Sequence, residues 1–154
     1  SNERLVGGEP VADLRVRYQP LKGIVISDAQ IPLAIDEFPV LFIAAACAEG
    51  DTVLRGAHEL RVKESDRLNA MAQGLNILGV VVETFDDGIK ITGGQMGGGA
   101  LDSFGDHRIA MAFTVAGLRS ESSIDIANCA NVATSFPNFV ELATKVGMRI
   151  TAEK

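Results

Sequence analysis

Hydrophobic residues are concentrated in several short stretches of the chain, alternating with polar residues in some of them, and these stretches predict β-strands. β-Branched residues are frequent in these stretches, and glycine, proline or aspartate residues bound them. The stretches lie at 13–19, 22–27, 52–60, 80–85, 89–93, 122–128 and 148–152. The sequence Asp86-Asp87-Gly88 separates 80–85 from 89–93, and such a short polar link predicts an antiparallel hairpin.

Apolar residues spaced three and four positions apart predict helices elsewhere. The predicted helices lie at 39–48, within 60–79, at 105–118 and at 135–147. Pro39 suits a first helical turn, and Gly50 and Gly79 suit helix C-terminal ends. Strands and helices follow one another in a strand-helix-strand-helix order that occurs twice. We therefore predict an α/β fold with some antiparallel pairing, in a single domain over residues 1–154 because no linker is apparent.

The composition excludes some classes of partner. The chain has 154 residues, enough for one packed domain, and its net charge of −6 makes a nucleic acid or an anionic membrane surface an unexpected partner. Its longest apolar run, 40–48, is far shorter than the ~20 residues of a membrane-spanning helix. Cys47 and Cys129 lack metal-site spacing, and we expect both to be reduced thiols. No signal peptide is apparent, and we predict a cytoplasmic protein. No cluster of His, Cys and carboxylates has metal-ligand spacing, so no metal is predicted, and no cofactor is expected.

Two predicted helices begin with cations where acidic residues are favoured. A helix N-terminus carries a partial positive charge and unpaired N–H groups, so Lys63 and Arg67 are unfavourable there if the helix extends back to include both. The same arrangement recurs at Asp106-His107-Arg108, where Asp106 is the predicted N-cap. One interpretation is that each arginine only pairs with an acidic neighbour at the surface. The other is that the two helix starts bind a ligand with two anionic groups.

Three acidic residues are candidates for proton transfer. Asp36 and Glu37 lie at a third predicted helix start, where the favoured interpretation is capping. A partly dry carboxylate there could instead be a general base, if its pKa is raised. Glu64 lies three residues before Arg67 and is either its ion-pair partner or a proton donor beside a bound anion. The glycine-rich stretch 93–99 lacks the lysine and the spacing of a phosphate-binding loop, so a flexible connection is predicted there.

Four motifs, in their order and separations, resemble the C-terminal domain of the EPSP synthases, the 3-phosphoshikimate 1-carboxyvinyltransferase family. They are IDEFPVL (35–41), LRVKESDRL (60–68), DHRIAMAF (106–113) and ATSFPNF (133–139). The form of VKESDR and ATSFP is most similar to the class II branch, and the resemblance runs from about residue 24 onward. It implies an α/β fold of repeated βαβαββ units. It also implies that this chain is most of the second domain, with an N-terminal domain that is absent.

The resemblance implies transfer of the enolpyruvyl group of phosphoenolpyruvate to the 5-hydroxyl of shikimate 3-phosphate, with release of phosphate. By position, Asp36 matches the aspartate that accepts the hydroxyl proton, and Glu64 matches the glutamate that passes a proton to the methylene carbon. The positions that match substrate-binding residues are Lys63, Arg67, His107 and Arg108. The family holds the shikimate phosphate with its N-terminal domain, so the fragment alone is expected to be inactive. Two alternatives stay open: UDP-N-acetylglucosamine as the acceptor, and a non-catalytic binding module on the same scaffold.

Overall fold

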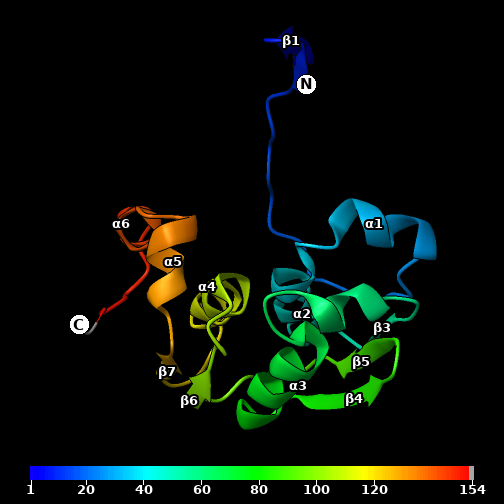
Figure 1. Cartoon of the computed structure of the whole chain (residues 1–154), viewed down its shortest axis with the longest axis vertical. Coiled ribbons are helices and arrows are strands. Elements are labelled where there is room, and N and C mark those ends of the chain that lie inside the picture. Colours follow the sequence, from blue (N-terminus) through cyan, green and yellow to red (C-terminus); the bar gives the residue numbers. More distant parts are fainter. Residues whose placement is uncertain (153–154) are drawn as a thin grey trace.

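Three helices form the centre of the molecule. In the computed structural model, which describes residues 1–152, α2 (Phe38–Ala46), α3 (Arg67–Ile77) and α4 (His107–Ala116) contact one another (Figure 1). Their facing sides bury large apolar side chains: Phe38, Phe42, Leu68, Met71, Leu75, Ile109 and Phe113. Removing such a side chain from water stabilises the fold by about 1.5–3 kcal/mol. The prediction of helices in these three regions is confirmed.

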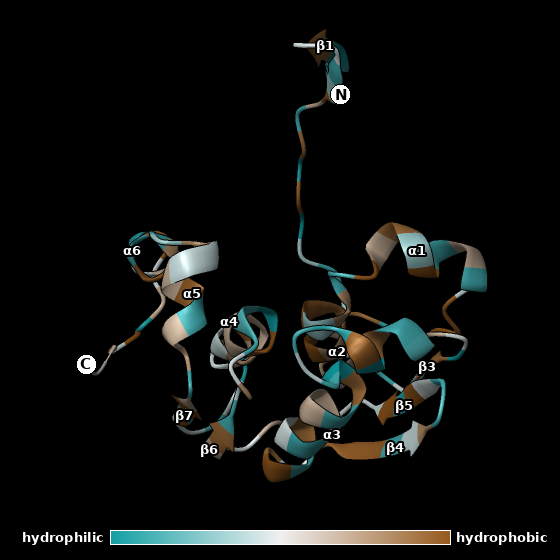
Figure 2. Cartoon of the chain, in the orientation of Figure 1, coloured by the Kyte–Doolittle hydropathy of each residue, from teal (hydrophilic) through white to brown (hydrophobic). Residues whose placement is uncertain are grey.

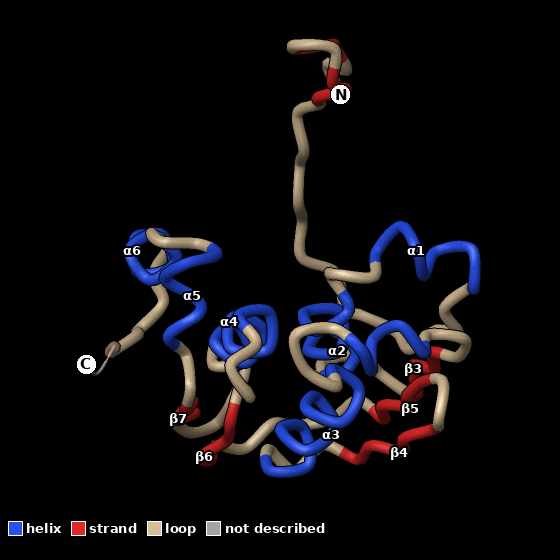
Figure 3. The backbone as a smooth tube through the Cα atoms, viewed as in Figure 1, coloured by secondary structure: helices blue, strands red, loops and turns tan. Residues whose placement is uncertain are grey.

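A three-stranded antiparallel sheet packs against two of these helices, α2 and α3. Its strands are β3 (Asp51–Leu54), β4 (Val81–Phe85) and β5 (Gly88–Thr92), in the order β3-β5-β4 (Figure 3). The central strand β5 is the most buried, and α2 and α3 both contact it. Phe85 pairs with Gly88 across a two-residue turn, so the predicted hairpin is confirmed. The strand expected at 52–60 ends at Leu54, because the chain then turns into the 3₁₀ segment η2 (His58–Val62).

A second, parallel pair of strands lies beside α4. Strand β6 (Gly99–Asp102) pairs with β7 (Ile124–Ala127), and α4 is the helix that connects them. Strand β7 falls within the predicted stretch 122–128, whereas β6 follows the glycine-rich connection and was not expected. Beyond β7, two short helices, α5 (Ala130–Ser135) and α6 (Phe139–Lys145), replace the single helix predicted at 135–147. Pro137 lies between them, and a proline disfavours helical geometry in the residue before it.

The first thirty-four residues differ most from the prediction. Strands β1 (Arg4–Val6) and β2 (Glu9–Val11) form a small hairpin, which a long extended segment joins to the body (Figure 1). Within the predicted strands 13–19 and 22–27, the structure has only two isolated bridges, Lys22 with Glu49 and Val25 with Val53. The 3₁₀ segment η1 (Asp28–Gln30) and helix α1 (Ile31–Ala34) follow. At the other end, the strand expected at 148–152 is absent from the described residues.

No single helix in the described part of the chain is long and apolar enough to cross a membrane. One bent pair of segments, Asp28–Ala34 and Phe38–Ala46 at 120°, is long and apolar enough when the two are taken together, by length and composition only.

A close contact fixes the distance between α3 and α4. Gly74 faces the ring of Phe113, and a Cβ atom at residue 74 would lie 2.2 Å from the ring atom Cζ. A larger residue would therefore push the ring or the helix away in an interior that is packed as densely as a crystal. Since both helices begin at candidate site residues, this contact helps to set how closely their N-terminal ends approach.

Candidate active site

Helix α3 begins at Arg67, later than the sequence suggested. Asp66 is its N-cap, and the Asp66 carboxylate accepts a hydrogen bond of 3.0 Å from the backbone N–H of Asn69. That cap satisfies one of the unpaired N–H groups of the first turn and ends the helix on its N-terminal side. Lys63 is extended and lies outside the helix, so the helix does not extend back to include both Lys63 and Arg67.

Arg67 is fully buried and binds three carboxylates. Its Nε donates to Asp106 Oδ2 at 2.9 Å, its Nη1 to Asp36 Oδ1 at 3.0 Å, and its Nη2 to Glu64 Oε2 at 2.5 Å. Burial alone lowers the pKa of an arginine, but these carboxylates raise the pKa of Arg67 overall. The guanidinium therefore stays charged in the interior, where a lone charge would be very costly. Three acidic partners also resolve the unfavourable placement of a cation at a helix N-terminus.

Asp106 joins the starts of α3 and α4. It is the N-cap of α4, as predicted, and its Oδ1 accepts from the backbone N–H of Arg108 at 2.9 Å. Its Oδ2 accepts from Arg67 and, at 3.0 Å, from the hydroxyl of Ser65. Burial raises the pKa of Asp106, but the hydrogen bond and charge of Arg67 outweigh burial and hold the pKa below its usual value. The side chain is thus an ionised carboxylate with both oxygens engaged.

Asp36 lies between the two arginines that the sequence singled out. Its Oδ1 accepts from Arg67, and its Oδ2 is 3.3 Å from Arg108 Nη2. The Nη1 of Arg108 donates to the backbone carbonyl of Asp36 at 3.0 Å and lies 3.6 Å from Glu37 Oε1. Neither acidic side chain caps α2, so the favoured capping interpretation is wrong. The sequence placed these two arginines at separate helix starts, and the structure brings both to one carboxylate.

The pKa of Asp36 is lowered, which is the opposite of the condition set for a general base. The hydrogen bond from Arg67 is the main cause, partial burial opposes it, and the charges of Arg108 and Lys63 add to the lowering. An ionised Asp36 can accept a proton, but with these cations beside it the carboxylate is a weaker base than a free one. The Asp36 carboxylate would become a stronger base if another anion replaced it as the partner of one of the arginines.

The ion pairs described above join Asp36, Glu64, Arg67, Asp106 and Arg108 into one charged cluster. Two predicted site residues lie at the edge of this charged cluster. Lys63 forms an ion pair with Glu59, and the Lys63 side chain is 23% exposed. His107 is the first residue of α4 and is half-buried, with no side-chain hydrogen bond to the described residues. Within residues 1–152, no group of three or more His, Cys, Asp or Glu side chains could hold a metal ion.

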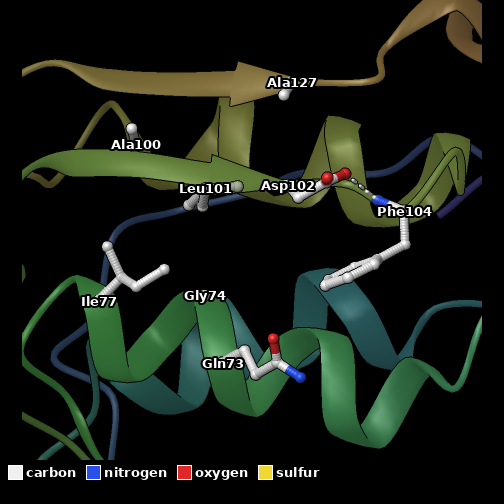
Figure 4. Close-up of a pocket in the computed structure, with 8 residues that line it drawn as sticks. All are labelled: Gln73, Gly74, Ile77, Ala100, Leu101, Asp102, Phe104 and Ala127. Carbon is white, nitrogen blue, oxygen red and sulfur yellow. Dashed lines mark hydrogen bonds between the residues drawn. The ribbon is translucent and has the colours of Figure 1, made fainter.

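A small hollow of 120 Å³ opens beside the charged cluster. Asp36, Glu37 and Arg108 provide its polar side, and residues of α2 and α4 provide the rest. A larger hollow of 350 Å³ lies elsewhere, between α3 and the strands β6 and β7 (Figure 4). In Figure 4 Gln73 and Ile77 face Leu101 and Phe104 across this space, and only Asp102 contributes a charge. The charged chemistry is therefore beside the smaller hollow.

The sequence missed the role of Asp106 as a partner of Arg67. The two residues are 39 positions apart, and each taken alone has an ordinary local explanation as a cap or a helix residue. Ser65, inside the motif KESDR, was not singled out either, although its hydroxyl contacts the same carboxylate. No pattern of spacing could reveal these contacts, because they depend on how α3 and α4 pack.

Known proteins resemble this chain along most of its length. A sequence model described as EPSP synthase (3-phosphoshikimate 1-carboxyvinyltransferase) matches residues 3–142. The 3-phosphoshikimate 1-carboxyvinyltransferase of Alkalilimnicola ehrlichii is 64% identical over 151 residues, which is 97% of this chain and 34% of that protein. The protein of the same name from Methylococcus capsulatus is 65% identical over 147 residues, 96% of this chain and 34% of that protein.

A solved structure shows the same fold. EPSP synthase from Acinetobacter baumannii superposes with a TM-score of 0.96 at 53% identity, covering 99% of this chain and 36% of that one. The mixed α/β arrangement described above is thus shared with that structure. The chain spans about a third of the length of the relatives it matches.

Proposed function

We propose that this chain, which belongs to the EPSP synthase family, supplies one side of the active site of a 3-phosphoshikimate 1-carboxyvinyltransferase. In that reaction the enolpyruvyl group of phosphoenolpyruvate passes to the 5-hydroxyl of shikimate 3-phosphate, and phosphate is released. The chain corresponds in this proposal to most of the C-terminal domain of a cytoplasmic enzyme. The remainder of the polypeptide, about two thirds of the relatives' length, supplies the other side.

The convergence of Arg67 and Arg108 on Asp36 supports this proposal most directly. The two guanidinium groups come from different helix starts and lie 3.0 Å and 3.3 Å from the two oxygens of one carboxylate. A carboxylate already fits between them, so the geometry suits a carboxylate or phosphate of similar size. Phosphoenolpyruvate carries both kinds of group.

The two arginines play different parts in the proposed binding. Arg67 is held by the buried Asp106 and acts as the fixed cation. The Arg108 side chain is 30% exposed, and its ion pairs with Asp36 and Glu37 are long, at 3.3 Å and 3.6 Å. To turn toward an incoming anion, Arg108 gives up these long ion pairs and its 3.0 Å hydrogen bond to the backbone carbonyl of Asp36, while Arg67 only exchanges one carboxylate for another.

Proton transfer falls to the two exposed carboxylates of the cluster. Asp36 accepts the proton of the attacking hydroxyl, and its basicity rises when phosphoenolpyruvate takes its place at an arginine. Glu64 contacts Arg67 Nη2 and is half exposed, so it can deliver a proton to the methylene carbon beside the bound anion. Lys63 exchanges Glu59 for the shikimate 3-phosphate, and His107 lies beside Arg108 at the start of α4.

The test measures phosphate release in a full-length enzyme that carries this sequence as its matching third. Arg108→Ala is expected to raise the KM for phosphoenolpyruvate at least tenfold, as loss of a charge-assisted hydrogen bond does. Arg55→Ala is the matched control, because Arg55 is also an arginine in an exposed ion pair, with Asp87. Equal KM values in the two variants would contradict the proposal. The 154-residue chain alone is expected to release no phosphate from the two substrates.

A further inference from the structure

Arg61, in the 3₁₀ segment η2, joins two parts of the molecule that lie outside the charged cluster. Its Nε donates to the backbone carbonyl of Asp86 at 2.7 Å, and its Nη2 donates to that of Phe85 at 2.6 Å. Its Nη1 donates to Asp66 Oδ2 at 2.8 Å. Figure 2 shows the turn between β4 and β5, which provides the two carbonyls, as a hydrophilic stretch. One guanidinium thus connects this turn to the N-cap residue of α3.

The contacts of Arg61 fix Asp66 at both of its carboxylate oxygens. Oδ1 accepts from the backbone N–H of Asn69 as the cap of α3, and Oδ2 accepts from Arg61. A guanidinium is a rigid, planar fork of donors, so three acceptors at short distances also determine its own orientation. The ion pair between Arg61 and Asp66 therefore closes the loop 62–65 at both of its ends.

The loop 62–65 carries three residues that contact or border the charged cluster. Glu64 pairs with Arg67, the hydroxyl of Ser65 donates to the buried Asp106, and Lys63 lies at the edge. Residues 63–65 are in no helix or strand, and their backbone groups form no hydrogen bond within residues 1–152. The position of the loop therefore depends on its side-chain contacts and on its two ends.

We propose that Arg61 is a positioning residue, which together with Asp66 holds the loop 62–65 so that Lys63 and Glu64 face the substrates. This inference rests on the function proposed above, in which Lys63 binds shikimate 3-phosphate and Glu64 delivers a proton. The Nε, Nη1 and Nη2 atoms of Arg61 all donate to acceptors of the protein itself. Arg61 therefore acts on the substrates through the loop and not by contact.

A positioning role predicts an uneven effect on the two substrates. Arg67 is held by the buried Asp106, and Arg108 is part of α4, so neither arginine takes its position from the loop 62–65. Loss of the Arg61 contacts should therefore weaken the binding of shikimate 3-phosphate and slow proton transfer. The binding of phosphoenolpyruvate should stay nearly unchanged. A residue that only stabilised the fold would affect both substrates alike.

Phosphate release in a full-length enzyme that carries this sequence as its matching third tests the proposal. Arg61→Lys keeps the charge, but an ammonium lacks the planar fork that joins Asp66 to the two carbonyls. The kcat/KM for shikimate 3-phosphate is expected to fall about tenfold or more, because a small misplacement of reacting groups is costly. The KM for phosphoenolpyruvate is expected to change by less than about threefold. The matched control is Arg55→Lys, because Arg55 binds the same turn through Asp87 and does not contact Asp66.

Two results would overturn the positioning role. One is equal kinetic constants in Arg61→Lys and Arg55→Lys. The other is an equal rise of both KM values in Arg61→Lys, which indicates a general loss of structure.

Asp66→Asn tests the same ion pair from its other side. The asparagine oxygen can still cap α3, but the ionised partner of Arg61 is lost. The same selective fall is expected, and Arg61→Lys combined with Asp66→Asn should be little worse than the more impaired single variant, because both break one contact. Effects that simply add would overturn the proposal. If Arg61→Lys does not fold, Asp66→Asn decides, and an unchanged kcat/KM for shikimate 3-phosphate then overturns it.

Arg108→Ala separates this inference from the proposed function. An unchanged KM for phosphoenolpyruvate in Arg108→Ala contradicts the proposed function and this inference with it. The expected rise in Arg108→Ala, together with equal constants in Arg61→Lys and Arg55→Lys, overturns only the positioning role of Arg61.

Discussion

Replacing Asp106 by asparagine is expected to destabilise the chain far more than the same replacement of an exposed aspartate. The Asp106 side chain is fully buried, and its oxygens accept from Arg67 Nε, Ser65 Oγ and the Arg108 backbone N–H at 2.9, 3.0 and 2.9 Å. Asparagine has nearly the same shape, so the change removes charge and one acceptor without opening a cavity. The loss therefore reports the electrostatic role of the carboxylate.

The expected loss of unfolding free energy depends on the partners that Arg67 keeps. Removing one member of a buried ion pair costs about 3–5 kcal/mol, because the other charge is left without compensation. Arg67 keeps Asp36 and Glu64, and the asparagine oxygen can still accept from the Arg108 N–H. We therefore expect the lower end, about 3 kcal/mol of unfolding free energy. That is a large part of the 5–15 kcal/mol that is usual for a domain.

Urea unfolding at neutral pH measures this loss, with the free energy extrapolated to water. The control is Asp51→Asn, because Asp51 pairs with Lys90 at the surface and its removal is expected to change the stability little. Equal losses in the two variants, with unchanged slopes, would refute the reasoning that burial makes the Asp106 carboxylate important.

Three further outcomes are expected. The pKa of Asp106 is lowered in the fold, so the stability that its carboxylate contributes is present above the unfolded pKa of about 3.9 and is lost as the pH falls below it. In Asp106→Asn the free energy of unfolding should therefore fall less steeply at acidic pH than in the unchanged protein. An equally steep fall in both proteins would disprove this. Arg67→Lys should raise the KM for phosphoenolpyruvate more than Arg55→Lys in the full-length enzyme, because a lysine ammonium lacks the planar fork of donors with which arginine binds carboxylate and phosphate groups. Burial raises the pKa of the Cys129 thiol, so in a Cys47→Ser background iodoacetamide should modify Cys129 more slowly than free cysteine; equal rates would contradict it.

Local signals were enough to predict the parts of the fold that are formed by neighbouring residues. The turn at Asp86-Asp87 identified its hairpin, and apolar spacing identified the three central helices. The segment 13–19 has the pattern of a strand, but a pattern cannot provide the partner that a strand requires. In 135–147 the apolar spacing outweighed Pro137 in the prediction, and the structure follows the proline.

The candidate site was predictable in its members but not in its connections. Arg67 and Arg108 stood out because each violates the charge preference of a helix start. That Asp36 lies between them depends on the packing of α2 against α3 and α4, which no local spacing encodes. The same packing lowers the pKa of Asp36, where sequence reasoning had required it to be raised.

The contact between Gly74 and Phe113 restricts how this protein can evolve. Alanine is the best helix former, and glycine in a helix interior costs about 1 kcal/mol relative to it. Mutation to alanine would therefore improve α3 as an isolated helix, yet the Phe113 ring leaves no room for even one added carbon. The chain thus retains a residue that is unfavourable for the helix taken alone. A sequence drifting toward greater helix stability at this position would lose the spacing that brings Arg67 within reach of Asp106.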